Sequence, residues 1–347
     1  PPHCIMEGGD VVTVAIELNG QPPLQAYIRR TEEYSITLRS IDLGKQEQIN
    51  TFENLKDYSD LDSGFSIPKA CLGLCGFHPD FSQEKYSSLE NQLEDIGCGL
   101  DVTFFSAVPK GSGLGTSSLL SATILSGLSD FCGLNWDRYE ICDRVLALEQ
   151  LLTSGGGWQD QYGGIFPGVK LLHTERGLNQ IPLIKWLPDT LFRDTEFSRC
   201  LILYYTGITR VAKNLLSEIV EGMFLNDREG VRALHDIKRH AEYLAEVIQL
   251  GDFAKFGEGI GETWRLKKSL DPDTNNDEIQ RIIDLIQDLS LGYLLPGAGG
   301  GGFLFIVAKD PQAAGMIRSR LIEYKGNNKN RLVDMELSGV GTKVTRS

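Results

Sequence analysis

Three glycines at alternate positions separate a strand-like run from a helix-forming run, and this arrangement limits the possible folds of the chain more than any other feature. The segment reads Pro109-Lys-Gly-Ser-Gly-Leu-Gly-Thr-Ser-Ser118. It follows an alternating run from Leu100 to Ser106 and leads into a helix-forming stretch from Thr116 to Phe131. Its glycines let the backbone turn tightly and approach a ligand closely. The sequence therefore predicts a strand, a glycine loop and a helix in succession.

The predicted helix makes this loop suitable for binding an anion. The first N–H groups of a helix have no partner within the helix, and the positive end of the helix dipole lies beside them. A phosphate group suits such a position. We therefore expect a phosphate-binding loop made of Gly111, Ser112, Gly113, Leu114, Gly115, Thr116, Ser117 and Ser118. The spacing matches neither a Walker P-loop nor a dinucleotide fingerprint, and the alternative is a turn capped by Ser or Thr.

The composition disfavours several classes of protein. The chain has 347 residues and a formal net charge of −13, and an acidic chain without basic runs binds nucleic-acid phosphates poorly. No stretch approaches the roughly 18 apolar residues of a membrane span, and no signal peptide is evident. Seven cysteines stand in apolar surroundings without the spacing of a zinc site. This pattern indicates reduced, buried thiols and a cytoplasmic protein.

The order of the remaining patterns predicts an α+β protein with two domains. Strand-like runs dominate the first half, where Asp10 to Leu18 ends at Asn19-Gly20 and Leu24 to Arg30 follows at hairpin distance. Helical patterns dominate the second half. They cover Thr209 to Leu250, Phe253 to Leu270, Asp277 to Leu289 and a stretch after Pro311. We expect the two domains to cover residues 1–197 and 198–347.

Two carboxylates follow the glycine loop. On the helical run from about Trp136 to Thr153, Glu149 shares one stripe with Cys142, Val145 and Leu152, so its side chain points toward the interior. A buried carboxylate needs a cation or several donors, which a magnesium ion or an arginine would supply. Asp160 lies in the glycine-rich loop that follows, where an Asp is often a turn former and where Trp158 could line a sugar.

A third glycine-rich segment, Leu295-Pro-Gly-Ala-Gly-Gly-Gly-Gly-Phe303, precedes an apolar strand from Phe303 to Ala308. Gly297, Gly299 and Gly302 match GxGxxG as letters, but a dinucleotide site has its glycines after a strand and before a helix. The order therefore disfavours an NAD-dependent oxidoreductase. We expect a second backbone wall beside the Ser112–Ser118 loop, because glycines let the chain pass close to a nucleotide or substrate.

In this order, the three segments resemble the motifs of the GHMP superfamily of small-molecule kinases. Those enzymes carry a P-x-x-x-G-L-G-S-S-A loop, an acidic pair and a late G-A-G-x-G-G loop. Within the superfamily, Thr153-Ser-Gly-Gly-Gly-Trp-Gln-Asp-Gln-Tyr-Gly-Gly164 and Tyr205-Thr-Gly-Ile-Thr-Arg210 are similar to L-fucokinases, in particular to the kinase half of the bifunctional bacterial fucokinase/guanylyltransferases. Pro1-Pro2 resemble the end of the family's opening GGW[ST]DTPP motif, whose Asp and Arg are absent from this chain.

The resemblance implies a fold and a reaction. The fold is a ribosomal-protein-like N-terminal domain followed by a ferredoxin-like C-terminal domain. The reaction is ATP-dependent phosphorylation of L-fucose at its anomeric hydroxyl, which feeds GDP-fucose synthesis. Asp160 would act as the base, and Ser117 and Glu149 would hold Mg²⁺. The residues that would contact substrate or phosphate are Gly297, Ala298, Gly299, Gly300, Trp158 and Arg210. An upstream nucleotidyltransferase domain in the parent chain is also implied.

Two further functions fit the same superfamily. One is a kinase of another sugar, such as a heptose 7-phosphate, because those kinases also carry an Asp-Gln-Tyr element; the neighbourhood of Trp158 favours fucose. The other is a non-catalytic sensor of sugar or ATP. Glu149 and Asp160 together count against a sensor, since a sensor has no need for both carboxylates.

Overall fold

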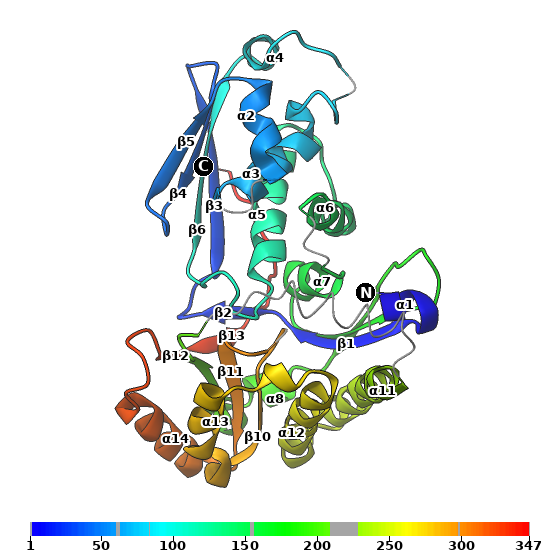
Figure 1. Ribbon diagram of the computed structural model, residues 1–347, viewed down its shortest axis with the longest axis vertical. Coiled ribbons are helices and arrows are strands. Elements are labelled where there is room, and N and C mark those ends of the chain that lie inside the picture. The colour runs from blue at the N-terminus through cyan, green and yellow to red at the C-terminus, as the bar shows by residue number, and fades with distance from the viewer. Residues whose placement is uncertain are drawn as a thin grey trace. The chain divides into compact units, whose positions relative to one another are not determined.

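The computed structural model, drawn as a ribbon in Figure 1, describes residues 2–59, 63–82, 84–152, 156–208, 228–297 and 299–346. Its helices and strands confirm the α+β class. The chain forms two compact units, and each is discontinuous in sequence. Unit 1 contains Pro1–Pro22, Lys110–Gly115 and Tyr162–Gly341, and unit 2 contains Pro23–Pro109, Thr116–Gln161 and Thr342–Ser347. The domain boundary between residues 197 and 198 stays a prediction.

Unit 2 is built on a four-stranded sheet with the strand order β3-β6-β4-β5. β3 (Leu24–Thr31) pairs antiparallel with β6 (Gly99–Ser106), β6 pairs parallel with β4 (Ile36–Ser40), and β5 (Lys45–Ile49) forms the edge. Helix α5 (Thr116–Phe131) packs along β3, as Figure 1 shows. Helix α6 (Arg138–Leu151) packs on α5. The predicted strand, glycine loop and helix are therefore confirmed, and α5 has the predicted bounds.

Short helices between β5 and β6 are not predicted by the sequence pattern. They are α2 (Phe52–Lys56), the 3₁₀ turn Asp57–Ser59, α3 (Ser66–Leu72), the π-helical turn Gly73–Phe77 and α4 (Leu89–Ile96). None exceeds 8 residues, so helical periodicity has little length in which to appear. Their N-terminal caps are clearer, since Thr51 and Ser88 accept hydrogen bonds from Asn54 N and Asn91 N. The expectation of a first half dominated by strands is wrong for this stretch.

Unit 1 contains an antiparallel sheet with the strand order β10-β11-β9-β12. The strands are β9 (Leu201–Tyr205), β10 (Ser290–Leu294), β11 (Phe303–Ala308) and β12 (Arg331–Val333). Helices lie between β9 and β10, and one further helix lies between β11 and β12: α11 (Arg228–Leu250), α12 (Phe253–Leu270), α13 (Asp277–Asp284) and α14 (Pro311–Glu323). Two helical connections around a central hairpin make this the predicted ferredoxin-like arrangement.

The helix predictions in this half agree with the structure. α12 has the predicted bounds, α14 begins at Pro311, and α11 lies inside the expected stretch, of which residues 209–227 are outside the described residues. α13 begins at Asp277 as predicted but ends at Asp284, because the last residues of the expected helix form a 3₁₀ turn, Gln287–Leu289. Long amphipathic helices are readable because their apolar stripe repeats over several turns.

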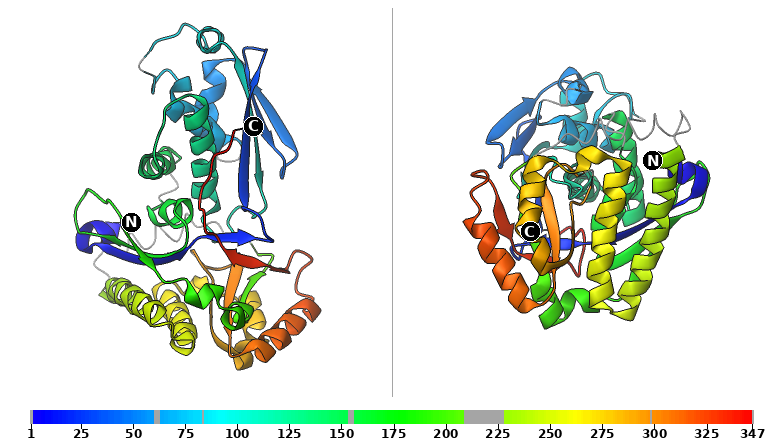
Figure 2. Two further views of the ribbon diagram at one scale, coloured as in Figure 1. Left: turned by 180° about the vertical axis from the view of Figure 1, so that it is seen from behind. Right: turned by 60° about the horizontal axis from the view of Figure 1, so that its bottom comes forward.

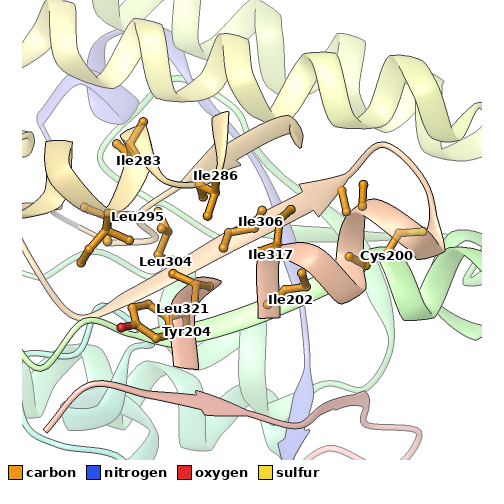
Figure 3. Close-up of a cluster of buried hydrophobic side chains, with 14 of the residues drawn as sticks. Cys200, Ile202, Tyr204, Ile283, Ile286, Leu295, Leu304, Ile306, Ile317 and Leu321 are labelled. Atoms are coloured by element: carbon orange, nitrogen blue, oxygen red, sulfur yellow. The ribbon is translucent and has the colours of Figure 1, made fainter. Parts of the chain in front are cut away.

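The core of this sheet anchors the loop between β10 and β11. In Figure 3, Leu304 and Ile306 of β11 lie beside Ile317 of α14, with Ile202 of β9 and Ile286 nearby. Each of these side chains is at most 2% exposed. Full burial of such a side chain stabilises a fold by about 1.5–3 kcal/mol. The third glycine-rich segment is therefore a loop between two well-packed strands.

A second sheet of unit 1 has the order β1-β7-β8, with β1 (Gly9–Val14), β7 (Val169–Thr174) and β8 (Leu183–Leu187). A two-stranded sheet joins β2 (Ile16–Leu18) to β13 (Met335–Leu337). Short helices complete the unit: α1 (Pro2–Glu7), α7 (Gln159–Ile165), α8 (Thr190–Arg193) and α9 (Thr195–Cys200), of which α7 begins in unit 2. Helix α11 packs on β1 and lies beside α12, as the right-hand view of Figure 2 shows.

The expected hairpin between the first two strand runs is wrong. The turn itself forms, because Asn19 and Gly20 both have positive φ (52° and 71°) and Leu18 and Gln21 exchange backbone hydrogen bonds. Pro22 and Pro23 follow, and a proline has no N–H with which to continue the ladder. β1 and β2 therefore pair with β7 and β13, and β3 pairs with β6.

The cysteines form no disulfide bonds in the structure. All seven cysteines are free thiols, and five of them are buried. Burial raises the pKa of the Cys132 thiol to about 11. None of the helices in the described ranges has the length and apolar character to cross a membrane.

Candidate active site

The loop before α5 has the backbone conformation that its glycines permit. Gly111, Gly113 and Gly115 have φ of 75°, 82° and 65°, and the residues between them keep negative φ. Positive φ is costly for any residue with a Cβ, so each of the three positions favours glycine. Alternation of left-handed and right-handed backbone turns successive N–H groups toward one side and forms an anion-binding concavity. The local geometry agrees with the predicted phosphate loop.

In unit 1 this loop packs against the third glycine-rich segment, backbone to backbone. Phe303 N donates to Ser112 O at 3.0 Å. A Cβ on Gly113 would lie 2.6 Å from Pro296 O, and one on Gly302 would lie 2.1 Å from Ser112 O. Heavy atoms do not approach this closely, so the two loops meet only because neither has side chains at these points. The two segments lie side by side as expected, and the role of the second one as a wall for a nucleotide or substrate stays a prediction.

The far part of the third segment is held by its own set of hydrogen bonds in unit 1. Gly300 N donates to Thr274 O at 2.7 Å, and Asn276 Nδ2 donates to Gly300 O at 3.0 Å. Gly302 N donates to Ile208 O at 2.8 Å. The described residues of this loop are therefore held by hydrogen bonds to their backbone atoms, which limits the entropy that ligand binding has to remove.

Lys267 of α12 holds the near part of the same loop, although no motif in the sequence pointed to this residue. Its Nζ donates to Leu295 O and, at 2.6 Å, to Gly297 O. Burial lowers the pKa of its ammonium group to about 8. The only sequence signal is a pair of lysines, Lys267-Lys268, on the last turn of a helix, which is common.

Glu149 of α6 lies in unit 2 with its carboxylate against the first turn of α5. It is 6% exposed, which confirms the predicted inward stripe. The Ser118 hydroxyl donates a hydrogen bond to Glu149 Oε1. A Cβ on Gly156 would lie 2.2 Å from Glu149 Oε2, so the loop after α6 also passes close to this carboxylate. Ser117, the predicted metal ligand, is exposed.

Both carboxyl groups of the predicted acidic pair have raised pKa values. Burial raises the pKa of Glu149 to about 7, with a smaller lowering by the Ser118 hydrogen bond and a further rise from the charge of Asp160. Burial raises the pKa of Asp160, in the first turn of α7, to about 6. The effect of the Asp160 charge on Glu149 indicates that the two carboxyl groups of unit 2 lie near each other. Perturbed carboxyl groups of this kind are typical of functional sites.

Trp158 and Gln161 flank Asp160 and are buried, with 3% and 0% exposure. The Trp158 indole N–H and both Gln161 amide atoms form no hydrogen bond with the described residues. Buried polar groups are normally satisfied, so these atoms indicate room for water or a polar ligand nearby. The predicted contact between Trp158 and a sugar stays a prediction, because the side chain is buried and exposes little surface. Gln161 is a further candidate site residue that was not predicted from the sequence.

Lys170 of β7 is a second lysine to which no sequence motif pointed. Its side chain is fully buried, and Nζ donates to Gly163 O at 2.8 Å, Gly168 O at 3.1 Å and Pro167 O at 3.4 Å. Burial lowers its pKa to about 7. Gly163 lies in the last turn of α7, where helix carbonyls lack intrahelical partners. Lys170 therefore supplies donors to the C-terminal end of the helix that carries Asp160.

Two of the predicted contact residues, Arg210 and Ala298, lie outside the described residues. A divalent cation fits the donors that are described, since a carboxylate and hydroxyl groups are the oxygen ligands that Mg²⁺ takes. Within the described ranges, no three His, Cys, Asp or Glu side chains form a metal cluster. The protein would therefore hold such a cation with few ligands and leave the others to nucleotide phosphates or water.

Comparison with known proteins shows the family of this chain. The model of the GHMP kinases N terminal domain matches residues 83–168, and that of the GHMP kinases C terminal domain matches residues 241–327. The chain is 56% identical over 347 residues to the L-fucokinase/L-fucose-1-P guanylyltransferase of Bacteroides fragilis, which covers 100% of this chain and 37% of that protein. It is 31% identical over 328 residues to the bifunctional fucokinase/GDP-fucose pyrophosphorylase of Arabidopsis thaliana, covering 93% and 30%.

The chain spans about a third of the length of these two relatives. Its fold is also that of a solved structure, the mevalonate kinase of Methanococcus jannaschii. The two agree with a TM-score of 0.67 at 18% identity, over 97% of this chain and 94% of that one. The two-domain fold expected from the sequence is thereby confirmed, and the chain belongs to the GHMP kinases.

Proposed function

We propose that this chain catalyses ATP-dependent phosphorylation of L-fucose at the anomeric hydroxyl, giving L-fucose 1-phosphate and ADP for GDP-fucose synthesis. The observation that carries the proposal is the pair of neighbouring carboxyl groups, Glu149 and Asp160, with pKa values raised to about 7 and about 6. They follow a glycine loop shaped for phosphate. Two fucokinases among the relatives favour fucose over a heptose 7-phosphate, and the acidic pair favours a kinase over a sensor.

In this proposal the loop from Gly111 to Ser118 binds the ATP phosphates with its backbone N–H groups. Such N–H groups neutralise developing charge without having to reorient. The loop from Gly297 to Gly300, which includes Ala298, forms the second wall beside the phosphates. Arg210 would pair with a phosphate oxygen, and Trp158 would contact the sugar. Phosphoryl transfer depends mainly on positioning and charge neutralisation, so these groups should carry much of the rate.

Glu149 and Ser117 would hold Mg²⁺, and the Ser118 hydroxyl would orient the Glu149 carboxylate. A bound magnesium ion supplies charge neutralisation for the β- and γ-phosphates. A second consequence follows for Glu149, because a nearby cation favours its ionised form and offsets the cost of its burial. The buried carboxylate and the hydroxyls of this chain fit that ion.

Asp160 would accept the proton of the anomeric hydroxyl while the sugar oxygen attacks the γ-phosphorus of ATP. The new bond is between that oxygen and phosphorus, the broken bond joins phosphorus to the β–γ bridging oxygen, and ADP leaves. A pKa of about 6 makes Asp160 a stronger base than an ordinary Asp while it stays ionised at pH 7.

The proposal extends to the parent protein. Residues 1–197 and 198–347 would be its two kinase domains, and an upstream nucleotidyltransferase domain would use the sugar 1-phosphate. The Bacteroides fragilis relative carries both activities in its name. We also propose a cytoplasmic location, which the free thiols and the proposed use of ATP support.

The test is ADP release from Mg·ATP with L-fucose, D-mannose, D-galactose and a heptose 7-phosphate. It should use this chain and a chain extended upstream through the GGW[ST]DTPP motif. Turnover that depends on fucose supports the proposal, and turnover in the extended form alone shows that the upstream motif completes the site. Preference for the heptose would replace fucose as the substrate, and ATP binding without turnover on any sugar would favour the sensor.

A further inference from the structure

Lys267 connects α12 to the turn that precedes the third glycine-rich segment. Its Nζ donates to the carbonyls of Leu295 and Gly297, which lie on either side of Pro296. Leu295 is fully buried, and the Lys267 ammonium is itself desolvated. The carbonyl of the buried Leu295 would otherwise need another donor in a place that water reaches poorly, whereas Gly297 is exposed and Lys267 fixes its position. The lysine therefore stabilises one conformation of this turn.

The turn that Lys267 holds is also the one that meets the phosphate loop. A Cβ on Gly113 would lie only 2.6 Å from the Pro296 carbonyl oxygen, and a Cβ on Gly297 would lie 2.9 Å from the Gly113 Cα. The backbone of Pro296 and Gly297 is thus in van der Waals contact with Gly113. A shift of the turn would displace Gly113, whose φ of 82° belongs to the alternating conformation described above.

The rest of the segment is held by other groups. Thr274 and Asn276 hydrogen-bond Gly300, and Ile208 accepts from Gly302. Loss of Lys267 would therefore free the near end of the segment while the far end and the β11 strand stay anchored. The expected effect is local, on the turn and on Gly113, and not on the whole sheet.

We propose that Lys267 is a positioning residue for ATP: it fixes the Leu295–Gly297 turn, and through the turn it fixes the Gly113 backbone that binds phosphate. The inference deepens the proposed function and depends on the ATP role of the Gly111–Ser118 loop. Lys267 also places a positive charge behind a loop that faces phosphate, which favours the bound anion.

The test compares Lys267→Met with Lys268→Met, its neighbour on α12. Both variants lose one positive charge. The Lys268 ammonium, however, lies over the Trp264 ring, 5.7 Å from its centroid, and forms no hydrogen bond with the described residues of the loop. MgATP affinity is measured by calorimetry without sugar, and KM for ATP, KM for sugar, kcat and Tm are measured in parallel. Lys267→Met leaves the buried Leu295 carbonyl without this donor and lets the turn shift against Gly113. We therefore expect the variant to bind ATP about tenfold or more weakly.

Three further results are expected. Lys268→Met should keep ATP affinity within about twofold, since a screened surface charge is worth little. Lys267→Met should change KM for ATP more than KM for sugar. Lys267→Arg should recover part of the affinity, because a guanidinium group also donates to carbonyls. Equal affinity loss in Lys267→Met and Lys268→Met would overturn the inference, and so would a lowered Tm with unchanged ATP affinity.

If the unmodified chain binds no ATP, the proposed function fails, and the inference is then decided by hydrogen exchange. Faster exchange at residues 110–116 in Lys267→Met, relative to Lys268→Met, would support the coupling between the lysine and the phosphate loop. Unchanged exchange there would reject it.

Discussion

Two regions that carry the proposed chemistry are built in opposite ways. In unit 1, Ser112 and Gly113 meet Pro296 and Gly302 through backbone atoms, and the contact exists because side chains are absent. In unit 2, Ser118, Glu149 and Asp160 form the site with side chains, and burial raises the pKa of both carboxyl groups. The first region should respond to added volume and the second to charge and pH.

This difference fits the roles that we propose for the two regions. A phosphate is bound by backbone N–H groups that must come close, so any Cβ in the way is excluded. A carboxylate that acts as a base or as a metal ligand lies away from water, and its ionised form is stabilised by the bound cation or substrate. Substitutions that add volume in the backbone region and substitutions that remove charge in the carboxyl region should therefore have different effects.

The largest effect is expected for Asp160→Asn, which removes the base but keeps the shape. The kcat should fall by about 10²–10⁴ with ATP affinity retained. Steady-state kinetics and calorimetry measure the two quantities. Asp143→Asn, at an exposed position of α6, serves as the control and should leave both unchanged. A near-normal kcat in Asp160→Asn would remove Asp160 from the role of base.

Gly113→Ala should disturb the backbone region most. The left-handed φ costs about 1–2 kcal/mol for a residue with a Cβ, and here the Cβ would also meet Pro296 O at 2.6 Å. ATP affinity should fall by about tenfold or more, in keeping with displacement of a bound group. Gly133→Ala is the matched control, because Gly133 has φ of 68° and nothing within 4 Å of a Cβ. It should lose stability without losing ATP affinity; equal losses in both variants would reject the contact argument.

Glu149→Gln tests the carboxyl region through stability and pH. A folded-state pKa of about 7 against an ordinary value of 4.5 means that the folded protein binds a proton that the unfolded chain releases. Without metal and ATP, this contribution destabilises the fold progressively as pH rises through that window, and it is complete above pH 7. Glu149→Gln removes it. At pH 8 the variant should gain up to about 3 kcal/mol of unfolding free energy, at about 1.4 kcal/mol for each pKa unit.

The gain should be smaller at pH 5, where the unmodified protein keeps most of the proton. Denaturant unfolding at the two pH values measures it. An equal gain in unfolding free energy at pH 5 and pH 8 would show that other groups in the folded chain already offset the cost of ionising the buried Glu149.

The smallest effect is expected for Ser118→Ala. The Ser118 hydroxyl lowers the pKa of Glu149, so its loss should make the carboxylate harder to ionise and the metal harder to bind. Apparent Mg²⁺ affinity, read from the metal dependence of kcat/KM, should weaken by about tenfold. Ser117→Ala distinguishes the hydroxyl that orients Glu149 from the predicted metal ligand. A larger loss in Ser117→Ala would support Ser117 as the ligand, and no loss would assign that role elsewhere.

Local features of the fold were predictable from the sequence. The glycine loop, the start of α5 at Thr116 and the whole of α12 agree with the sequence pattern. The inward direction of Glu149 does too. Each depends on residues close in sequence: helical periodicity repeats over several turns, and glycine is favoured wherever φ is positive.

Nonlocal features were not predictable in the same way. Pro22 and Pro23 ended the first hairpin, and the partners of β1 and β2 came from distant parts of the chain. The strands β7 and β8 and the short helices of unit 2 were missed. A strand pattern shows which face is buried but does not show which strand lies beside it.

The candidate site divides along the same line. The sequence by itself determined the glycines, the two carboxylates and the family, because their residue types and order carry the chemistry. Only the tertiary structure decided that Ser118 bonds to Glu149, that Gly113 lies against Pro296, and that Lys267 and Lys170 donate to backbone carbonyls. Those contacts join residues far apart in the chain, and the burial that shifts their pKa values exists only once the chain has folded.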